Sequence, residues 1–123
     1  MALIKKFEDI VAWQEARNLV KVVYKLTSTG DFSKDFGLRG QIRRASVSTM
    51  TNIAEGFDCE SNLEFARFLV IARRSAVEVQ SLLYTAFDVN YIDENLLKMH
   101  HDQAYKTKGL INALKRSLKI QSK

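Results

Sequence analysis

Apolar residues recur along most of the 123-residue chain at alternating steps of three and four positions. This spacing puts them on one face of an α-helix, because successive residues turn about 100° around its axis. Four segments carry the pattern, and they predict helices at about residues 8–28, 35–57, 62–89 and 93–119. The third segment has the most regular apolar stripe, which runs from Phe65 to Phe87.

Short polar turns separate the four segments and contain residues that start helices. Ser61 and Glu64 match a capping box, in which the serine hydroxyl and the glutamate carboxylate each accept from the other residue's backbone amide. Asp93 is placed to cap the fourth helix. Four long helices joined by short turns predict an all-α fold, an antiparallel up-down-up-down four-helix bundle that forms a single domain over residues 1–123.

Two of the predicted helices carry more apolar surface than one buried face requires. Val11 and Val22 flank the main stripe of the first helix. Val70, Val77 and Tyr84 form a second strip on the third helix. Apolar strips of this kind mark surfaces that are buried against another molecule, so we expect the chain to form a homo-oligomer.

The composition agrees with long, uninterrupted helices. The chain has no proline and only five glycines, although turns draw heavily on both residues. Its first residues lack the apolar run of a signal peptide, and no window approaches the roughly 18 apolar residues that cross a membrane. We therefore expect a cytoplasmic protein that does not associate with membranes.

Basic residues are clustered rather than evenly spread. The formal net charge is +5, and the stretch from Lys98 to Lys123 holds seven basic residues against one acid, Asp102. Clustered cations bind phosphate backbones without choosing a sequence. A solvated lysine face near a helix C-terminus explains the same pattern, so both interpretations stay open. The candidate nucleic-acid-binding residues are Arg39, Arg43, Arg44, Arg73, Arg74, Lys115, Arg116 and Lys119.

The stretch RRASVSTMTNIAEGF, residues 43–57, departs from a plain apolar stripe. Ser48, Asn52 and Glu55 fall on one helical face, at steps of four and three. No glycine-flanked nucleophile turn surrounds the serines, so the pattern does not favour catalysis. We interpret this row as a structural polar seam, in which Asn52 and Glu55 hydrogen-bond across helices or to an arginine.

Metal and thiol chemistry have little support in the sequence. His100 and His101 are adjacent and cannot chelate one metal from the same side of a helix; we expect His100 in the core or an interface and His101 at the surface. Cys59, the single cysteine, has no cationic partner at a fixed spacing and is expected to be a bystander. We therefore assign no catalytic residue, no metal ligand and no cofactor. A small-molecule or metal site would need a polar pocket with convergent groups.

Three stretches carry a resemblance to a known family: FEDIVAWQEARNLVKVVYKLT, LRGQIRRASVSTMTNIAEGF and SNLEFARFLVIARRSAVEVQSLL. They resemble the four-helix-bundle proteins encoded by intervening sequences of bacterial large-subunit rRNA genes. The resemblance implies an antiparallel bundle that assembles into a ring of five subunits and has no enzymatic activity. Relatives include the accessory protein of diversity-generating retroelements, a basic pentamer that binds nucleic acid and a reverse transcriptase.

The chain departs from the family pattern in its second and third helices. Thr49 and Met50 stand where the family usually has isoleucine and proline, and Arg74 stands where glycine is common. We expect a non-enzymatic, homopentameric scaffold for RNA, DNA or a nucleic-acid-processing enzyme such as a reverse transcriptase. The alternative is a structural adaptor that has only protein partners.

Overall fold

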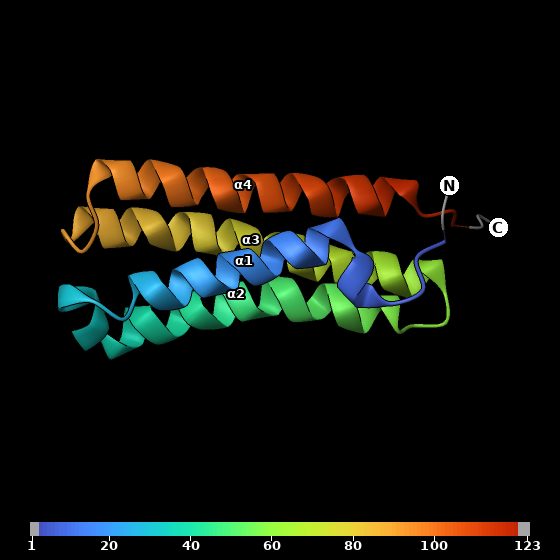
Figure 1. Cartoon of the computed structure of the whole chain (residues 1–123), viewed down its shortest axis with the longest axis horizontal. Helices are drawn as coiled ribbons and strands as arrows, with labels where there is room; N and C mark the ends of the chain where they lie inside the picture. The colour runs from blue at the N-terminus through green and yellow to red at the C-terminus, as the bar shows by residue number, and fades with distance from the viewer. Residues whose placement is uncertain (1–2, 121–123) are drawn as a thin grey trace.

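Four long α-helices form an antiparallel bundle in the computed structural model, which describes residues 3–120 (Figure 1). The helices run up and down alternately, and each packs on two neighbours, α1 on α2 and α4, and α3 on α2 and α4. This arrangement confirms the predicted all-α four-helix bundle. The helices are α1 (Val11–Leu26), α2 (Phe36–Phe57), α3 (Asn62–Asp88) and α4 (Glu94–Ser117).

Two short 3-10 helices, one before α1 and one before α2, were not predicted from the sequence. Phe7–Asp9 forms η1, and Ile10 is extended, so α1 begins three residues later than the predicted boundary. Ile10 nevertheless belongs to the core, because its side chain is 2% exposed. The second, η2 (Gly30–Lys34), lies between α1 and α2 and buries Phe32 against their ends.

Side-chain caps begin three of the helices. Asp35 Oδ1 accepts from the Leu38 amide at 3.0 Å, which caps α2. Ser61 Oγ accepts from the Glu64 amide at 3.1 Å, and Asp93 Oδ1 accepts from the Leu96 amide at 2.8 Å. The predicted caps at Ser61 and Asp93 are confirmed, but within residues 3–120 no hydrogen bond from the Ser61 amide to the Glu64 carboxylate completes the predicted capping box. Each satisfies a backbone donor that the first helical turn leaves unpaired.

The core consists of two apolar clusters, one in each half of the bundle. One cluster, near η2, contains Leu19, Phe32 and Leu83, and the other, near the chain termini, contains Ile53 and Ile111. Along each of α2, α3 and α4, buried hydroxyl side chains occupy the positions between the residues of one cluster and those of the other. We call this set the hydroxyl layer, and its members are Ser46, Thr49, Ser75 and Thr107.

The glycine at the end of α2 permits close packing of α2 against α3. A Cβ atom on Gly56 would lie 2.7 Å from Phe68 Cβ and 2.8 Å from Phe65 Cδ1. Both distances are shorter than carbon atoms tolerate, so a larger side chain would push the two helices apart. The tight α2–α3 contact therefore depends on the absence of a side chain at this position.

Candidate nucleic-acid interface

The polar stretch of α2 contributes one hydrogen bond between helices. Ser48 Oγ lies 2.8 Å from Ser75 Oγ on α3, and either hydroxyl can donate. Asn52 Nδ2 donates back to Ser48, to its carbonyl at 2.8 Å and its hydroxyl at 3.0 Å. Glu55 is exposed, and no ion pair within residues 3–120 involves it. The expected row of cross-helix bonds is thus reduced here to the Ser48–Ser75 pair, with Asn52 bonding along its own helix.

The hydroxyl layer explains much of the unusual composition of this stretch. Thr49 Oγ1 and Thr107 Oγ1 each donate to the carbonyl four residues earlier, Ala45 and Gln103, at 2.9 Å. Ser46 Oγ donates to the Arg43 carbonyl at 2.9 Å. Buried hydroxyls are tolerated when they are hydrogen-bonded, so these residues can sit inside the bundle. They perform packing rather than chemistry.

Two of the candidate arginines are engaged inside the chain. Arg39 donates to the Ser33 carbonyl at 2.6 Å, and its guanidinium lies over the Phe36 ring. Arg43 donates to Thr27 Oγ1 at 2.8 Å and to Ser28 Oγ at 3.1 Å. These bonds hold the connection between α1 and α2 against the start of α2. Such engaged donors are less available to a phosphate than the donors of a free guanidinium.

The other cations gather on α3 and α4. Residues 65–77 of α3 contain no acidic residue, and neither do residues 103–120, which comprise the second part of α4 and the three residues after its end. The two segments are antiparallel neighbours, because Asn62 Nδ2 donates to the Lys119 carbonyl at one end and Gln80 contacts His101 at the other. We call a set of seven of these cations the basic face. Its members are the exposed Arg67, Arg74, Lys115, Arg116 and Lys119 and the half-buried Arg73 and Lys108.

The basic face unites five of the eight sequence candidates and adds two residues. Arg44 is exposed but belongs to α2, near the end of the bundle where Arg39 and Arg43 lie. The additions are Arg67 and Lys108. Their seven-residue steps to Arg74 and Lys115 place each pair on one side of its helix, and that spacing was the available sequence signal.

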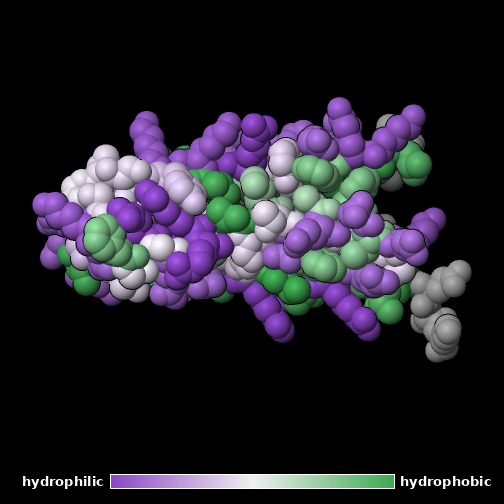
Figure 2. Space-filling view, turned by 90° about the horizontal axis from the view of Figure 1, so that it is seen from below, coloured by the Kyte–Doolittle hydropathy of each residue, from purple (hydrophilic) through white to green (hydrophobic). Residues whose placement is uncertain are grey.

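An apolar strip follows α3 beside these cations. Leu63 is 48% exposed, Val77 is 42% exposed and Tyr84 is 50% exposed, and Val70 between them is half-buried. The seven-residue spacing keeps the four side chains on one side of α3. A second apolar area lies on the side of α2, where Figure 2 shows hydrophobic side chains gathering over the half of the molecule nearer the chain termini.

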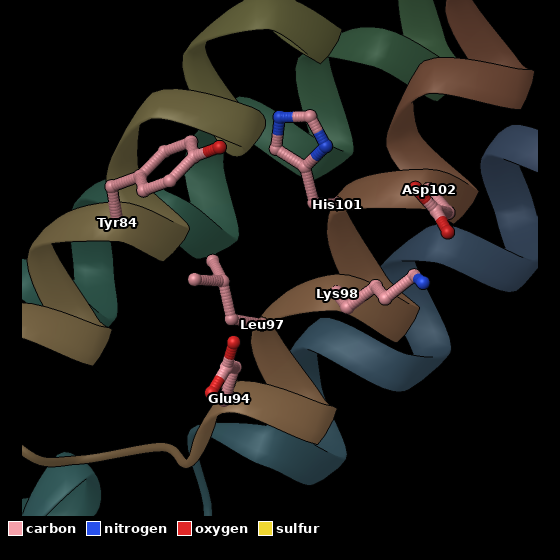
Figure 3. A pocket seen from close by; sticks show the side chains of 6 residues that line it. All are labelled: Tyr84, Glu94, Leu97, Lys98, His101 and Asp102. Atoms are coloured by element: carbon pink, nitrogen blue, oxygen red, sulfur yellow. The ribbon is translucent and has the colours of Figure 1, made fainter.

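A shallow pocket of about 290 Å³ opens between α3 and α4. Tyr84 and His101 point toward one another across it, and their ring centroids are 5.4 Å apart (Figure 3). Leu97 and Glu94 lie on the same side of α4, whereas Lys98 and Asp102 extend from the other side of that helix. His101 is therefore half-buried at a contact with α3 rather than freely exposed.

A second groove, of about 440 Å³, lies between α1 and α4 and is mainly apolar. His100 lines it and is only 8% exposed, in agreement with the expected core or interface position. Its Nδ1 atom is buried and has no hydrogen-bond partner within the described chain. Burial lowers the pKa of His100 below its usual value, and Gln103 opposes this effect. The imidazole is therefore neutral at pH 7.

Other reactive groups add no further site. Burial, followed by the Glu64 carboxylate, raises the pKa of the Cys59 thiol, which opposes formation of the reactive thiolate. Within residues 3–120 no group of three or more histidine, cysteine, aspartate or glutamate residues is placed to hold a metal ion. None of the helices in that range is long and apolar enough to cross a membrane.

Comparisons with known proteins place the chain in a family. A solved structure of a protein of unknown function from Bacteroides thetaiotaomicron, from the S23 ribosomal protein family, superposes with a TM-score of 0.78. It is 21% identical, and the match covers 87% of this chain and 100% of that chain. No curated protein matches the sequence significantly. The family model described as 23S rRNA-intervening sequence protein matches residues 8–113, and the chain therefore belongs to that family.

Proposed function

We propose that this protein is a non-enzymatic, homo-oligomeric scaffold that binds the phosphate backbone of RNA or DNA through the basic face. The observation that supports this function is the pairing of two acid-free helical segments, residues 65–77 and 103–120, side by side on α3 and α4. A cation beside an acid is partly neutralised, and here the acids lie at the borders of the two segments, at Glu64, Glu78 and Asp102. Most of the positive charge of the face therefore remains available to a polyanion.

The chemistry of the face is suited to phosphate rather than to base edges. Lysine and arginine neutralise phosphates and release bound counterions, which makes affinity fall steeply as salt rises. Lys106 is the exception among the cations of its segment, because its Nζ lies 3.8 Å from Glu15 Oε2 on α1. It therefore belongs to the α1–α4 contact and is left out of the face.

The scaffold is proposed to be a cytoplasmic homopentamer. In one isolated chain Leu63, Val70 and Val77 of the α3 strip and the apolar area beside α2 stay in contact with water, which is unfavourable for apolar side chains. Tyr84, at the far end of the strip, is left outside the proposed contact between copies. Burying them between identical copies would remove that cost and repeat the basic face around a ring. The same scaffold can hold a nucleic-acid-processing enzyme, such as a reverse transcriptase, on bound nucleic acid.

The apolar strip also favours a second candidate function, an adaptor that has only protein partners. Leu63, Val70 and Val77 lie directly beside Arg67 and Arg74, so a partner helix could contact both sets. In that case the cations would serve solubility and pairing with acidic side chains rather than phosphate binding.

A binding titration across a salt series separates the two functions. We expect fluorescent RNA and DNA oligonucleotides to bind at about 50 mM salt, with the logarithm of affinity falling linearly as the logarithm of salt rises. Replacing Arg67, Lys115 and Lys119 by glutamine should weaken binding and reduce that slope. The control replaces Lys6, Lys21 and Lys34, three exposed lysines outside the face, with the same loss of charge. Absence of binding at low salt would reject the nucleic-acid function.

Light scattering over a range of concentrations tests the assembly separately. We expect the mass of a pentamer, and a change of Val77 to lysine should shift the population toward smaller species if the α3 strip is buried between copies. The matched control is Val89 to lysine, because Val89 is 48% exposed and follows the end of α3. A monomer at every concentration would reject the ring.

A further inference from the structure

The pocket between α3 and α4 opens where the basic face ends. Tyr105 follows His101 by four residues on α4, which is about one helical turn. Tyr105 is 60% exposed, and Lys108 Nζ lies 4.7 Å from the centre of its ring. Lys108, Tyr105 and the pocket residue His101 thus follow one another along one side of α4, from the basic face toward the pocket.

The walls of the pocket suit a flat ring rather than a phosphate. Tyr84 is 50% exposed, so its aromatic ring is accessible to a ligand, and Leu97 adds an apolar surface beside it. Glu94, Lys98 and Asp102 also line the pocket. Glu94 lies on the same side of α4 as Leu97, where its carboxylate repels a phosphate, whereas Lys98 and Asp102 extend from the other side of the helix. The amino and ring N–H groups of a nucleobase can instead donate to a carboxylate.

The size and position of the pocket restrict the base to an unpaired one. A volume of about 290 Å³ accommodates a single base with room for water. In a duplex, neighbouring base pairs cover the faces of each base, and its pairing edge is occupied. Only a base that is free of a partner can present a face to Tyr84 and an edge to Glu94.

We propose that this protein prefers single-stranded nucleic acid, that one unpaired base stacks on Tyr84 in the α3–α4 pocket, and that neighbouring phosphates of the same strand lie on the basic face. The proposal rests on the proposed function, because the phosphates of the strand use the cations already described. It adds a base site, at Tyr84, Leu97 and His101, that phosphate binding alone does not require.

Anisotropy titrations with one fluorescent 20-nucleotide strand, alone or paired with its complement, test the base site. The informative variant is Tyr84→Leu, which removes the aromatic face but keeps an apolar side chain, and Tyr84→Phe restores the ring. Tyr24→Leu is the matched control, because Tyr24 is 41% exposed and belongs to α1. Thermal unfolding of each variant establishes that it retains the fold.

We expect Tyr84→Leu to weaken single-strand binding about tenfold, the loss that follows removal of one base–aromatic stack. Duplex binding should not change, and the salt dependence of single-strand binding should keep its slope because no phosphate contact is removed. Tyr84→Phe should bind single strands as the native protein does. Tyr24→Leu should leave both affinities unchanged.

Three outcomes would overturn the proposal, and they differ in what else they reject. Equal affinity for single strand and duplex, unaffected by Tyr84→Leu, would reject the base site and leave phosphate binding intact. No binding of either nucleic acid at about 50 mM salt would reject the base site and the proposed function together. Binding of an acidic helical peptide without any binding of nucleic acid would assign the face to a protein partner.

Discussion

Tyr91 Oη donates a hydrogen bond of 2.9 Å to Asp35 Oδ2, while the other carboxylate oxygen of Asp35 caps α2 through the Leu38 amide. One side chain thus starts α2 and also ties it to the connection between α3 and α4. The two residues are 56 positions apart in the sequence. The ring of Tyr91 also packs on Phe32 at a centroid distance of 5.3 Å, which secures η2 at the same end of the bundle.

The link between Asp35 and Tyr91 makes stability depend on pH in the acidic range. The Leu38 amide, and next the Tyr91 hydroxyl, hold the pKa of Asp35 below its usual value. Its stabilising effect is therefore complete above the unfolded-state pKa of about 3.9 and is lost as pH falls through the lower folded-state pKa. Asp35→Ala should lower the melting temperature by about 4 °C at pH 7, and by less in strong acid.

Circular dichroism melts of both proteins at pH 7 and pH 2 measure this difference. Tyr91→Phe should produce part of the same loss at pH 7, because the backbone cap at Leu38 remains. A melting-temperature difference that is equal at both pH values would contradict the predicted role of the carboxylate.

His100 should destabilise the protein as the solution becomes mildly acidic. Burial lowers its pKa in the folded state, so below about pH 6.5 the unfolded chain binds a proton that the folded chain resists. Stability should fall as pH drops from 7 to 5, and His100→Leu should abolish most of that fall. Urea unfolding at several pH values provides the measurement.

The matched control for this experiment is His101→Gln, since His101 is half-buried against α3 and does not line the groove between α1 and α4. The stability of this variant over the same pH range is the reference with which His100→Leu is compared. If the stability of His100→Leu falls between pH 7 and pH 5 as much as that of the native protein, other groups cause the pH dependence.

Glycine substitutions at two helical positions should have opposite effects. Gly56→Ala brings a methyl group within 2.8 Å of two phenylalanine side chains and should destabilise the fold by about 1–3 kcal/mol, despite the better helix propensity of alanine. Gly109→Ala meets no neighbouring atom within 4 Å and should stabilise α4 by about 1 kcal/mol. Chemical denaturation of the two variants compares them directly. Equal effects would mean that α2 and α3 are not in close contact at Gly56.

The Ser48–Ser75 hydrogen bond is expected to couple α2 and α3 energetically. A double-mutant cycle with alanine at each position should give a coupling energy of about 0.5–1.5 kcal/mol. Part of the stability lost in Ser48→Ala will come from a second hydrogen bond, because the Asn52 side-chain amide also donates to the Ser48 hydroxyl. For that reason the cycle is repeated with Asn52→Ala in the background. Additive single effects in both backgrounds would show that the hydroxyl pair does not stabilise the fold.

The fold follows from local signals in the sequence that agree with one another. The apolar stripes place the four helices, and Ser61 and Asp93 mark two of their starts through short side-chain bonds to nearby amides. The start of α1 was predicted three residues too early, because Ile10 is both extended and buried. Periodicity shows which side chains are buried but does not show whether the backbone carrying them is helical.

The candidate site was less predictable because its residues come together through packing. The charge pattern pointed to Lys115, Arg116 and Lys119, yet it could not show that Arg67 and Arg74 lie on the adjoining helix. Arg39 and Arg43 have the same charge, but they bond the α1–α2 connection, which depends on where η2 places its carbonyls and hydroxyls. Glu55 was expected to hydrogen-bond across helices or to an arginine, but it is exposed, because the spacing of the polar row does not show how far that side of α2 turns toward water.

The hydroxyl layer separates the core into two apolar clusters that share few neighbours. A cavity made in one cluster is lined by residues of that cluster alone. The losses of stability caused by substitutions at Leu19 and at Ile111 should therefore be nearly additive. Each end of the bundle can therefore tolerate its own amino-acid changes during evolution without compensating changes at the far end.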